Sequence, residues 1–364
     1  MSRLACVLLV AAMSTLPLLA QKKPEPKPES APASQPTIAI DPELQKEIDA
    51  INTAMSVKLN CVAGKNFDLV GTINPTQLQL LMEVADRTFK IFEEVTAGSG
   101  GVAGASATGN GSASGAPAGK TPAEALFGGR KCLVAVFNNG TQYQAFGKWY
   151  DEYYKFPYNF ADMKTRTYFP YAWPRSCIAT HLKPHDMNML RNVIAHEIGH
   201  VCGYRFAYNN ADSPIWFVEG LATCLEGRAT GTTNCYCFSG GYGDANASAK
   251  TLVNREWAKW KAQVKTQVKA KQEKTTEALL RMKLNEMTMN DVGKAMAVVD
   301  YWMKNEPAKL TQWIAATKKH WPQPFQADWS PAKGEAQKRA LKEVFGMEWP
   351  ELDEAVRKHV QASY

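Results

Sequence analysis

The stretch "VIAHEIGHVCGY" (residues 193–204) places two histidines and a glutamate inside an otherwise apolar run. Imidazole and carboxylate groups are costly to bury unless they find a partner or a metal ion. Residues four apart share one face of a helix, so His196 and His200 can bind the same ion. Glu197 directly follows His196, so its side chain points beside that ion. The spacing therefore predicts a buried helix that carries a metal site, with Glu197 as a neighbouring base.

A hydrolytic zinc site needs a third protein ligand and an open position. The stretch "SPIWFVEGLATCLEG" (213–227) begins with helix-start residues and carries Glu219 in an apolar helical pattern, 19 positions after His200. The intervening residues 201–212 allow the chain to turn back, and Ala222 is small enough for two helices to approach closely. We therefore expect Glu219 to complete a site of two histidines and one glutamate. The alternative is a pair of core histidines whose hydrogen bonds are satisfied without a metal.

The first 20 residues have the features of a secretory signal peptide. Arg3 precedes the apolar run "LACVLLVAAMSTLPLLA", and the small Ala20 suits the last position before a cleavage point. The run is too short, and its flanks are wrong, for a spanning helix. Residues 21–40 are rich in proline and charge, which predicts a disordered linker. Since no other stretch of 18 apolar residues follows, we expect an exported protein, periplasmic or extracellular, with no membrane span.

The rest of the chain predicts a single α+β domain over residues 41–364. The sequence is 45% hydrophobic and 21% charged, which is ordinary for a globular protein. Strand-like and helical patterns alternate in the N-terminal half, and a Gly-, Ala- and Ser-rich segment at 97–120 predicts a flexible insertion. Residues 187–364 are mainly helical, so the metal helix lies between a mixed α/β part and a helical subdomain. The best-defined elements are helices at 41–55, 74–95 and 141–154, and strands at 67–72, 131–139 and 176–182.

Positive charge is concentrated in one segment of this basic protein, whose net charge is +7. Within residues 255–283, Trp257, Trp260, Val264 and Val268 recur at helical spacing with lysines between them. This pattern predicts an amphipathic helix with one packed stripe and a solvated lysine face. Nucleic-acid binding is not expected, because no recognised motif accompanies the charge. Binding to an anionic surface remains the alternative.

Cysteines are numerous for a chain of this kind, and export favours disulfides. Removal of the signal peptide leaves an odd number of them, so at least one thiol is free or pairs elsewhere. Cys202 and Cys224 flank the two expected ligand helices, and we hypothesise that one or both join disulfides that brace the site. The seven cysteines are Cys61, Cys132, Cys177, Cys202, Cys224, Cys235 and Cys237.

"HEIGH" followed by "WFVEGLA" resembles the gluzincin zinc metallopeptidases, and more narrowly the peptidase-MA-like domains of exported bacterial proteins. The similarity covers roughly residues 60–360, strongly over 190–226 and loosely elsewhere. It implies a zincin-like fold, one Zn²⁺ ion per chain, and Glu197 as the general base. The implied zinc ligands are His196, His200 and Glu219.

The resemblance also implies an activity, the hydrolysis of peptide bonds in a peptide or protein substrate. Zinc lowers the pKa of a bound water toward about 7, and Glu197 takes its proton and passes it to the leaving amine. The strand expected at 176–182 would offer its edge to an extended peptide by backbone pairing. The sequence has no "GAMEN"-like stretch of the sort aminopeptidase gluzincins carry, so an endopeptidase is favoured over an aminopeptidase.

The sequence departs from the family pattern at two positions near the site. Relatives often carry a tyrosine, a donor to the oxyanion, near the start of the helix that matches "DVGKAMAVVDYWMK" (291–304). Here that start holds Asp291 and Val292, and Thr223 stands where many relatives have an acidic residue. A catalytically weak or inactive zinc-binding module, which binds peptides or envelope polymers, is therefore the alternative function. The remaining candidate oxyanion donors are Tyr204, Tyr208, Tyr242, Tyr301 and His181.

Overall fold

A computed structural model of the chain describes most of the region expected to fold. The described residues belong to one compact unit, which spans Thr37–Tyr364. The expected signal peptide (1–20), nearly all of the linker (21–40) and the insertion (97–120, apart from its first residue) lie outside them, so these expectations stay predictions. Within the described part, no helix combines the length and the apolar character needed to cross a membrane. The structure describes residues 39–97, 126–127, 129–155, 167–168, 175–181, 187–205, 213–234, 255–322 and 330–364.

A five-stranded sheet, in the order β1-β2-β3-β5-β4, forms the base of the unit. The three central strands β2, β3 and β5 are parallel, whereas β1 and β4 pair antiparallel at the two edges. Leu69 lies opposite Val134, which lies opposite Ile178. Central parallel strands are buried on both faces, which is why β3 reads as the continuous apolar run "CLVAVF". The strands are β1 (Asn60–Ala63), β2 (Phe67–Gly71), β3 (Cys132–Phe137), β4 (Thr167–Tyr168) and β5 (Cys177–His181).

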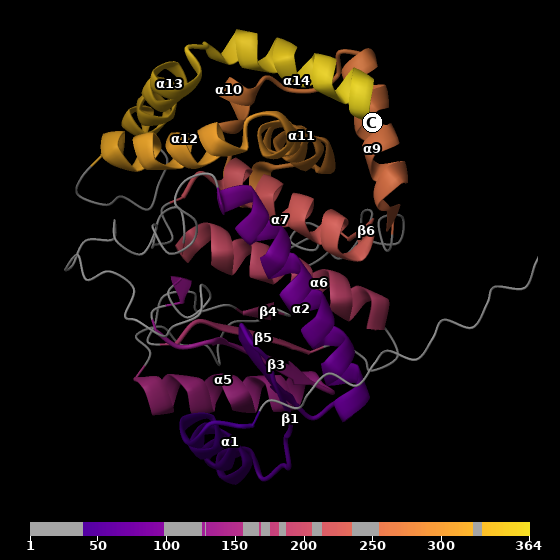
Figure 1. The fold of residues 1–364 in the computed structure, drawn as a ribbon, viewed down its shortest axis with the longest axis vertical. Coiled ribbons are helices and arrows are strands. Elements are labelled where there is room, and N and C mark those ends of the chain that lie inside the picture. Colours follow the sequence, from indigo (N-terminus) through magenta and orange to yellow (C-terminus); the bar gives the residue numbers. More distant parts are fainter. Residues whose placement is uncertain are drawn as a thin grey trace, which may run out of the picture. The chain divides into compact units, whose positions relative to one another are not determined.

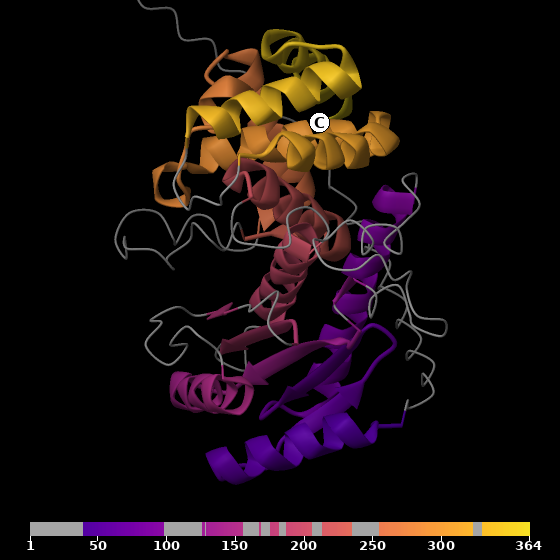
Figure 2. The same ribbon diagram turned by 90° about the vertical axis from the view of Figure 1, so that its left-hand side faces the viewer.

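Helices cover both faces of this sheet. Leu133 and Ala135 of β3 pack with α1 and α5 on one face, whereas Val134 and Val136 pack with α2 and α6 on the other. Figures 1 and 2 show α1 and α5 beneath the sheet, and α2 and α6 above it. The α6 helix therefore separates the sheet from the helical part of the unit. These helices are α1 (Pro42–Met55), α2 (Pro75–Thr96), α5 (Gly140–Tyr154) and α6 (Met187–Gly203).

The helical part is built around α7, which packs between α6 and α11. Trp216 of α7 meets Trp302 and Trp313, with ring centroids 5.9 and 5.8 Å away, and these rings fill the centre of the helical core. A two-stranded sheet of β6 and β7 follows α7. The elements are α7 (Ile215–Thr230), β6 (Thr232–Thr233), β7 (Arg255–Glu256), α9 (Trp257–Lys269), α10 (Thr276–Leu279), the 3-10 helix η6 (Leu284–Glu286), α11 (Met289–Asn305), α12 (Pro307–His320), α13 (Pro331–Phe345) and α14 (Trp349–Ser363).

The expected α+β class is confirmed, but one expectation about the sheet is wrong. The strand before the metal helix, now β5, was expected to offer its edge to a peptide. Instead β4 pairs with β5, with Thr167 opposite Thr180 and Tyr168 opposite Ala179. β4 precedes β5 in the sequence and pairs antiparallel with it, so among the described strands β4 forms the edge on this side of the sheet.

The hypothesis of disulfides that brace the site is also wrong for the two cysteines it names. Cys202 and Cys224 are both free thiols, and both are packed into the apolar core. The Cys224 thiol lies 3.3 Å from the carbonyl oxygen of Met296 and donates to it. Cys132 and Cys177 lie on adjacent strands but face opposite sides of the sheet. Close helix packing, rather than a covalent link, holds α6 against α7.

Gly199 is the point of closest approach between α6 and α7. A Cβ atom at this position would lie 2.6 Å from the Cα of Ala222, a contact that only movement of the backbone can relieve. We expect Gly199→Ala to lower the free energy of unfolding by about 1–3 kcal/mol, because the helices must separate. Gly203→Ala in the same helix is the control, since its Cβ would meet the flexible end of Leu221 at 3.2 Å and Val218 at an ordinary contact distance of 3.8 Å. Equal stability of the two variants in urea denaturation would contradict this account of the packing.

Candidate metal centre

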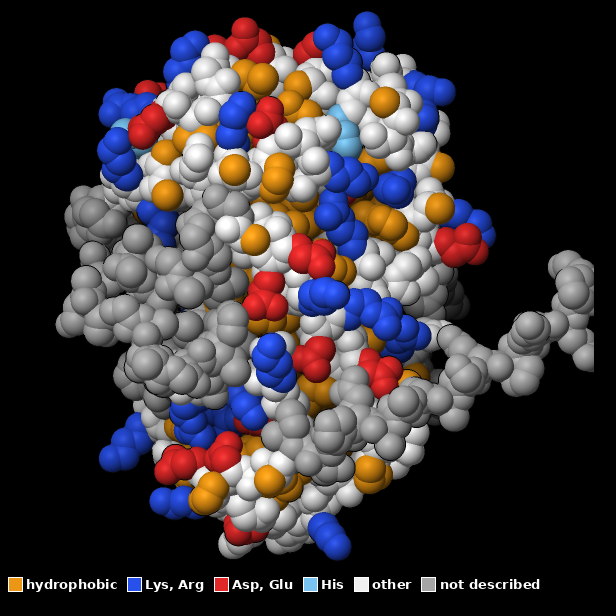
Figure 3. All heavy atoms as spheres, viewed as in Figure 1, with side chains coloured by type: hydrophobic (Ala, Val, Ile, Leu, Met, Phe, Trp, Pro, Cys, Tyr) orange, Lys and Arg blue, Asp and Glu red, His pale blue; other side chains and the backbone are white. Residues whose placement is uncertain are grey.

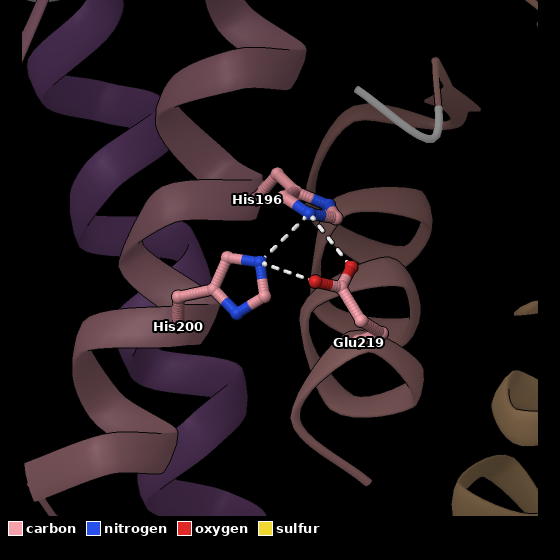
Figure 4. A group of neighbouring side chains, drawn as sticks. All are labelled: His196, His200 and Glu219. Atoms are coloured by element: carbon pink, nitrogen blue, oxygen red, sulfur yellow. Dashed lines mark hydrogen bonds and ion pairs between the residues drawn. The ribbon is translucent and has the colours of Figure 1, made fainter. Parts of the chain in front are cut away.

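Three side chains from α6 and α7 converge at the contact between these helices. His196 and His200 lie one turn apart on α6, and Glu219 projects from the second turn of α7 toward both rings (Figure 4). All three side chains are buried. The predicted close approach at Ala222 is what brings the two helices near enough for this convergence. The structure thus assembles the three residues that the sequence analysis selects as ligands.

The distances among these groups leave room for one small ion. Nε2 of His196 lies 3.0 Å from Nε2 of His200, and these atoms lie 3.6 and 3.5 Å from the two carboxylate oxygens of Glu219. Ligands at about 2.1 Å from a tetrahedral ion lie roughly 3.4 Å from one another. Imidazole ligands favour late transition metals over Ca²⁺ and Mg²⁺, which prefer oxygen. The group therefore fits a divalent transition-metal ion.

Burial changes the pKa values of two side chains at this site, and both changes are compatible with a bound cation. It lowers the pKa of His200 to about 4, so this imidazole is neutral at pH 7 and keeps a lone pair for a metal. Burial also raises the pKa of Glu197 to about 8, with smaller contributions from the carboxylates of Glu219 and Glu226. Glu197 Oε2 is buried and has no hydrogen-bond partner among the described residues. A bound cation would favour the ionised carboxylate, and a bound ligand would satisfy that oxygen.

A second carboxylate of α7, Glu226, holds the first histidine. Its Oε2 lies 3.2 Å from Nδ1 of His196 and accepts from it, which directs the Nε2 lone pair toward the ion site. Glu226 was not among the predicted site residues, because the family pattern places the acidic residue at the position of Thr223. Glu226 comes seven residues after Glu219, two helical turns along the same face, and that spacing is the signal that could have found it.

The short sheet of β6 and β7 fixes Glu226 in turn. The hydroxyl of Thr233 donates to Glu226 Oε2 at 3.0 Å, and the backbone N–H of Asn234 donates to Oε1 at 2.6 Å. The neighbouring Thr232 donates to Asn192 of α6 at 2.9 Å. The β6 strand and the residue after it therefore tie the end of α7 to α6 and hold Glu226, the partner of the candidate ligand His196, in place.

Comparison with models of known protein families finds no match to this chain, and comparison with curated proteins finds none either. The resemblance to the gluzincins therefore rests on the sequence motifs alone.

Tyr204 is the candidate oxyanion donor that the structure brings beside the metal centre. It follows His200 by one turn at the end of α6, and the two rings stack with centroids 6.0 Å apart. Its ring is largely buried, and only a small part of the residue reaches the surface. The Tyr204 ring therefore lies beside one of the three candidate ligands, His200.

Two other candidates lie away from the centre. Tyr301 belongs to α11, on the far side of α7 from α6, and its ring packs against that of His359 at 5.7 Å. His181 ends β5 and packs against Tyr143 of α5 at 4.9 Å, on the face of the sheet opposite α6. The structure therefore does not bring Tyr301 or His181 to the metal ligands. The last two candidates, Tyr208 and Tyr242, lie outside the described residues.

Proposed function

We propose that this protein is a zinc-dependent metallopeptidase of the gluzincin type that cleaves within extended peptides. The observation that carries the proposal is the convergence of His196, His200 and Glu219, whose ligand atoms lie 3.0–3.6 Å apart with Glu197 beside them. A pair of core histidines is a weaker explanation, because it accounts neither for the buried Glu219 nor for the unsatisfied oxygen of Glu197.

Zinc is the ion that best suits the proposed site. Two imidazoles and one carboxylate, with a fourth position left open, are the ligand set of catalytic zinc in several hydrolases. The separations among the ligand atoms are those expected around a tetrahedral ion with bonds of about 2.0–2.2 Å. The mixed sheet beneath α6, and the helical part beyond it, are what a zincin-like fold would have.

The chemistry of the proposed reaction is divided between the ion and Glu197. When bound, zinc lowers the pKa of a coordinated water toward about 7 and polarises the carbonyl of the substrate. The Glu197 carboxylate, ionised beside that cation, accepts a proton from the attacking water and returns it to the leaving amine. Glu226 keeps His196 in the tautomer that binds the ion, and Tyr204, whose ring stacks on that of His200, is the described phenol that we assign as the donor to the oxyanion.

The free edge of β4 is the proposed position for the substrate. β4 ends the sheet on the side from which the chain enters β5 and then α6. An extended peptide can pair with such an edge through its backbone, which tolerates many side chains. We therefore expect a broad sequence preference. Export to the periplasm or the cell exterior would give the enzyme protein substrates outside the cytoplasm.

Removal and return of the metal test the proposal. We expect the purified protein to hold one zinc ion per chain by elemental mass spectrometry and to cleave casein or a quenched peptide library. Treatment with 1,10-phenanthroline should abolish cleavage, and Zn²⁺ should restore it, whereas Mg²⁺ should not because it prefers oxygen ligands. One zinc per chain without cleavage of any peptide would favour an inactive binding module. Absence of bound transition metal would remove the proposal altogether.

A further inference from the structure

The α9 helix carries a face of unbalanced positive charge. Residues 257–272 hold five lysines and no acidic residue. As predicted, the helix is amphipathic, with Trp260, Val264 and Val268 buried against the rest of the helical part. The lysines occupy the other side of the helix. The packing of α9 against its neighbours requires no charged residues there, so it does not account for five of one sign.

Three of these lysines form a single row along α9. Lys261, Lys265 and Lys269 follow one another at intervals of four residues, so they lie on one face of the helix with Cβ atoms roughly 5–6 Å apart from one turn to the next. Like charges at this spacing destabilise a helix. The only carboxylate at its N-terminus, Glu256, pairs with Lys259 at 2.9 Å rather than with the row. A row of this kind suits a ligand that presents negative charges at regular intervals.

Cations from two other helices extend this row. Lys261 and Lys304 of α11 both lie over the ring of Tyr364, at 5.3 and 5.8 Å from its centroid. Burial lowers the pKa of Lys261, and repulsion from Lys304 and from Arg228 of α7 lowers it further. Lys265 donates to the backbone oxygen of Tyr364 at 3.1 Å. The charges of α7, α9 and α11 thus meet on one surface.

Several acidic residues of the described helices around this surface are already engaged by other groups. Asp300 is buried and accepts from Arg228 at 2.7 Å and from Lys304 at 2.9 Å. The same carboxylate also binds His359 and the hydroxyl of Tyr364. Beyond the row, Glu273 pairs with Arg357 and Asp291 pairs with Lys274. These pairs leave the lysine row in excess, and Figure 3 shows Lys and Arg side chains gathered on the side of the molecule where α9 lies.

Apolar side chains do not accompany the lysines, which argues against insertion into a bilayer. The large hydrophobic side chains that are exposed in the described residues are Ile40, Leu80 and Tyr153, and none of them lies on α9. Peripheral membrane helices combine basic residues with exposed apolar ones. The lysine surface therefore fits a soluble chain of anionic groups better than a lipid surface.

We propose that the lysine surface, defined as Lys261, Lys265, Lys269, Lys304 and Arg228, binds a linear polyanion. The repeating groups of the polymer, such as phosphates or carboxylates, follow the row along α9. The attraction is electrostatic and does not depend on a sequence in the ligand. The residues of this surface lie on α9, on α11 and near the end of α7, and none of them is a candidate ligand of the ion site. The inference is thus independent of the proposed peptidase activity, and it gives the protein a means of attachment to an anionic polymer.

Binding of inorganic polyphosphate tests this inference. We expect the full-length protein to bind labelled polyphosphate in fluorescence anisotropy at low salt, with an affinity that falls steeply as salt rises. The triple variant Lys261→Gln, Lys265→Gln, Lys269→Gln should raise Kd by at least about tenfold, because each lost contact also removes counterion release. Glutamine keeps most of the side-chain stem and removes the repulsion between the lysines, so zinc content should be unchanged and the melting temperature should not fall.

Three lysines elsewhere provide the matched control. Lys90, Lys148 and Lys358 are exposed, and each lies within 4.0 Å of a glutamate four residues away. Their joint change to glutamine alters net charge equally but should change Kd for polyphosphate by less than about twofold. If the two triple variants raised Kd for polyphosphate equally, the inference would be overturned. Failure of the wild-type protein to bind polyphosphate would overturn it too. Binding only to vesicles of anionic phospholipid would overturn it in favour of a membrane.

Discussion

Glu197→Gln is expected to abolish peptide hydrolysis and to leave the metal in place. The side chain lies on α6 between the two histidine ligands in sequence, but it is not part of the converging group. Glutamine has the same size and cannot accept a proton, so kcat/KM should fall by a factor of about 10²–10⁴. Zinc content, measured by elemental mass spectrometry, should remain at one ion per chain. Loss of zinc from this variant would mean that Glu197 is a ligand and not the base.

The same substitution should stabilise the metal-free protein. The pKa of Glu197 in the folded chain, about 8, lies above that of an unfolded glutamate. The folded state therefore binds this proton more tightly, and stability falls as pH rises from about 4.5 to about 8. Glutamine removes that loss, which is on the order of a few kcal/mol at pH 8. Urea denaturation of both apoproteins at pH 5 and pH 8 should show a gap that widens with pH. A gap that is constant would contradict the assigned cause.

Capping residues and buried strands of the fold were predictable from sequence. Asp41 accepts from the N–H of Leu44, and Asn74 accepts from that of Gln77, at the starts predicted for the first two helices. Their side-chain chemistry acts within four residues, so tertiary structure does not override it. The strand β3 was also predictable from local sequence. A strand buried on both faces is a continuous apolar run, which is visible without knowledge of the strands that pair with it.

Short edge strands were not predictable. The four residues of β1 are all half-buried and show no alternation, so only their pairing with β2, Asn60 opposite Gly71, defines them. The two residues of β4 give still less signal, so the sequence predicts β5 as the edge strand. Pairing between distant segments is a tertiary property, and a strand of two residues carries no periodicity of its own.

For the candidate site too, features set by local sequence were predictable and features set by tertiary packing were not. His196, His200 and Glu219 follow from local spacing on two helices, which the sequence displays directly. Glu226 was missed although it stands in the same helical stretch, because a family expectation directed attention to Thr223. Whether an acid meets a histidine depends on the angle between α6 and α7, and spacing within one helix does not report that angle.

Glu219→Gln is expected to remove most of the zinc affinity, because it deletes the only charged ligand of the proposed site. We expect Kd for zinc to rise by about 10³-fold or more, beyond the 10–100-fold that loss of a supporting group usually causes. At a zinc concentration 1,000 times the wild-type Kd, zinc should stabilise the wild type by about 4 kcal/mol and this variant by about 0.4 kcal/mol. Chelator competition gives the affinity, and denaturation with and without zinc gives the stabilisation, so neither measurement requires a substrate.

Glu226→Gln is the matched control, since it makes the same change two turns along α7. The amide oxygen can still accept from His196, but without the charge that strengthens this hydrogen bond. A weakening of 10–100-fold corresponds to a zinc-dependent stabilisation of about 1.4–2.7 kcal/mol under the same conditions. The order wild type, Glu226→Gln, Glu219→Gln therefore separates a ligand from its support. If the two variants lost zinc affinity equally, Glu219 could not be assigned as a zinc ligand. The convergence of side chains between α6 and α7 would then need another explanation.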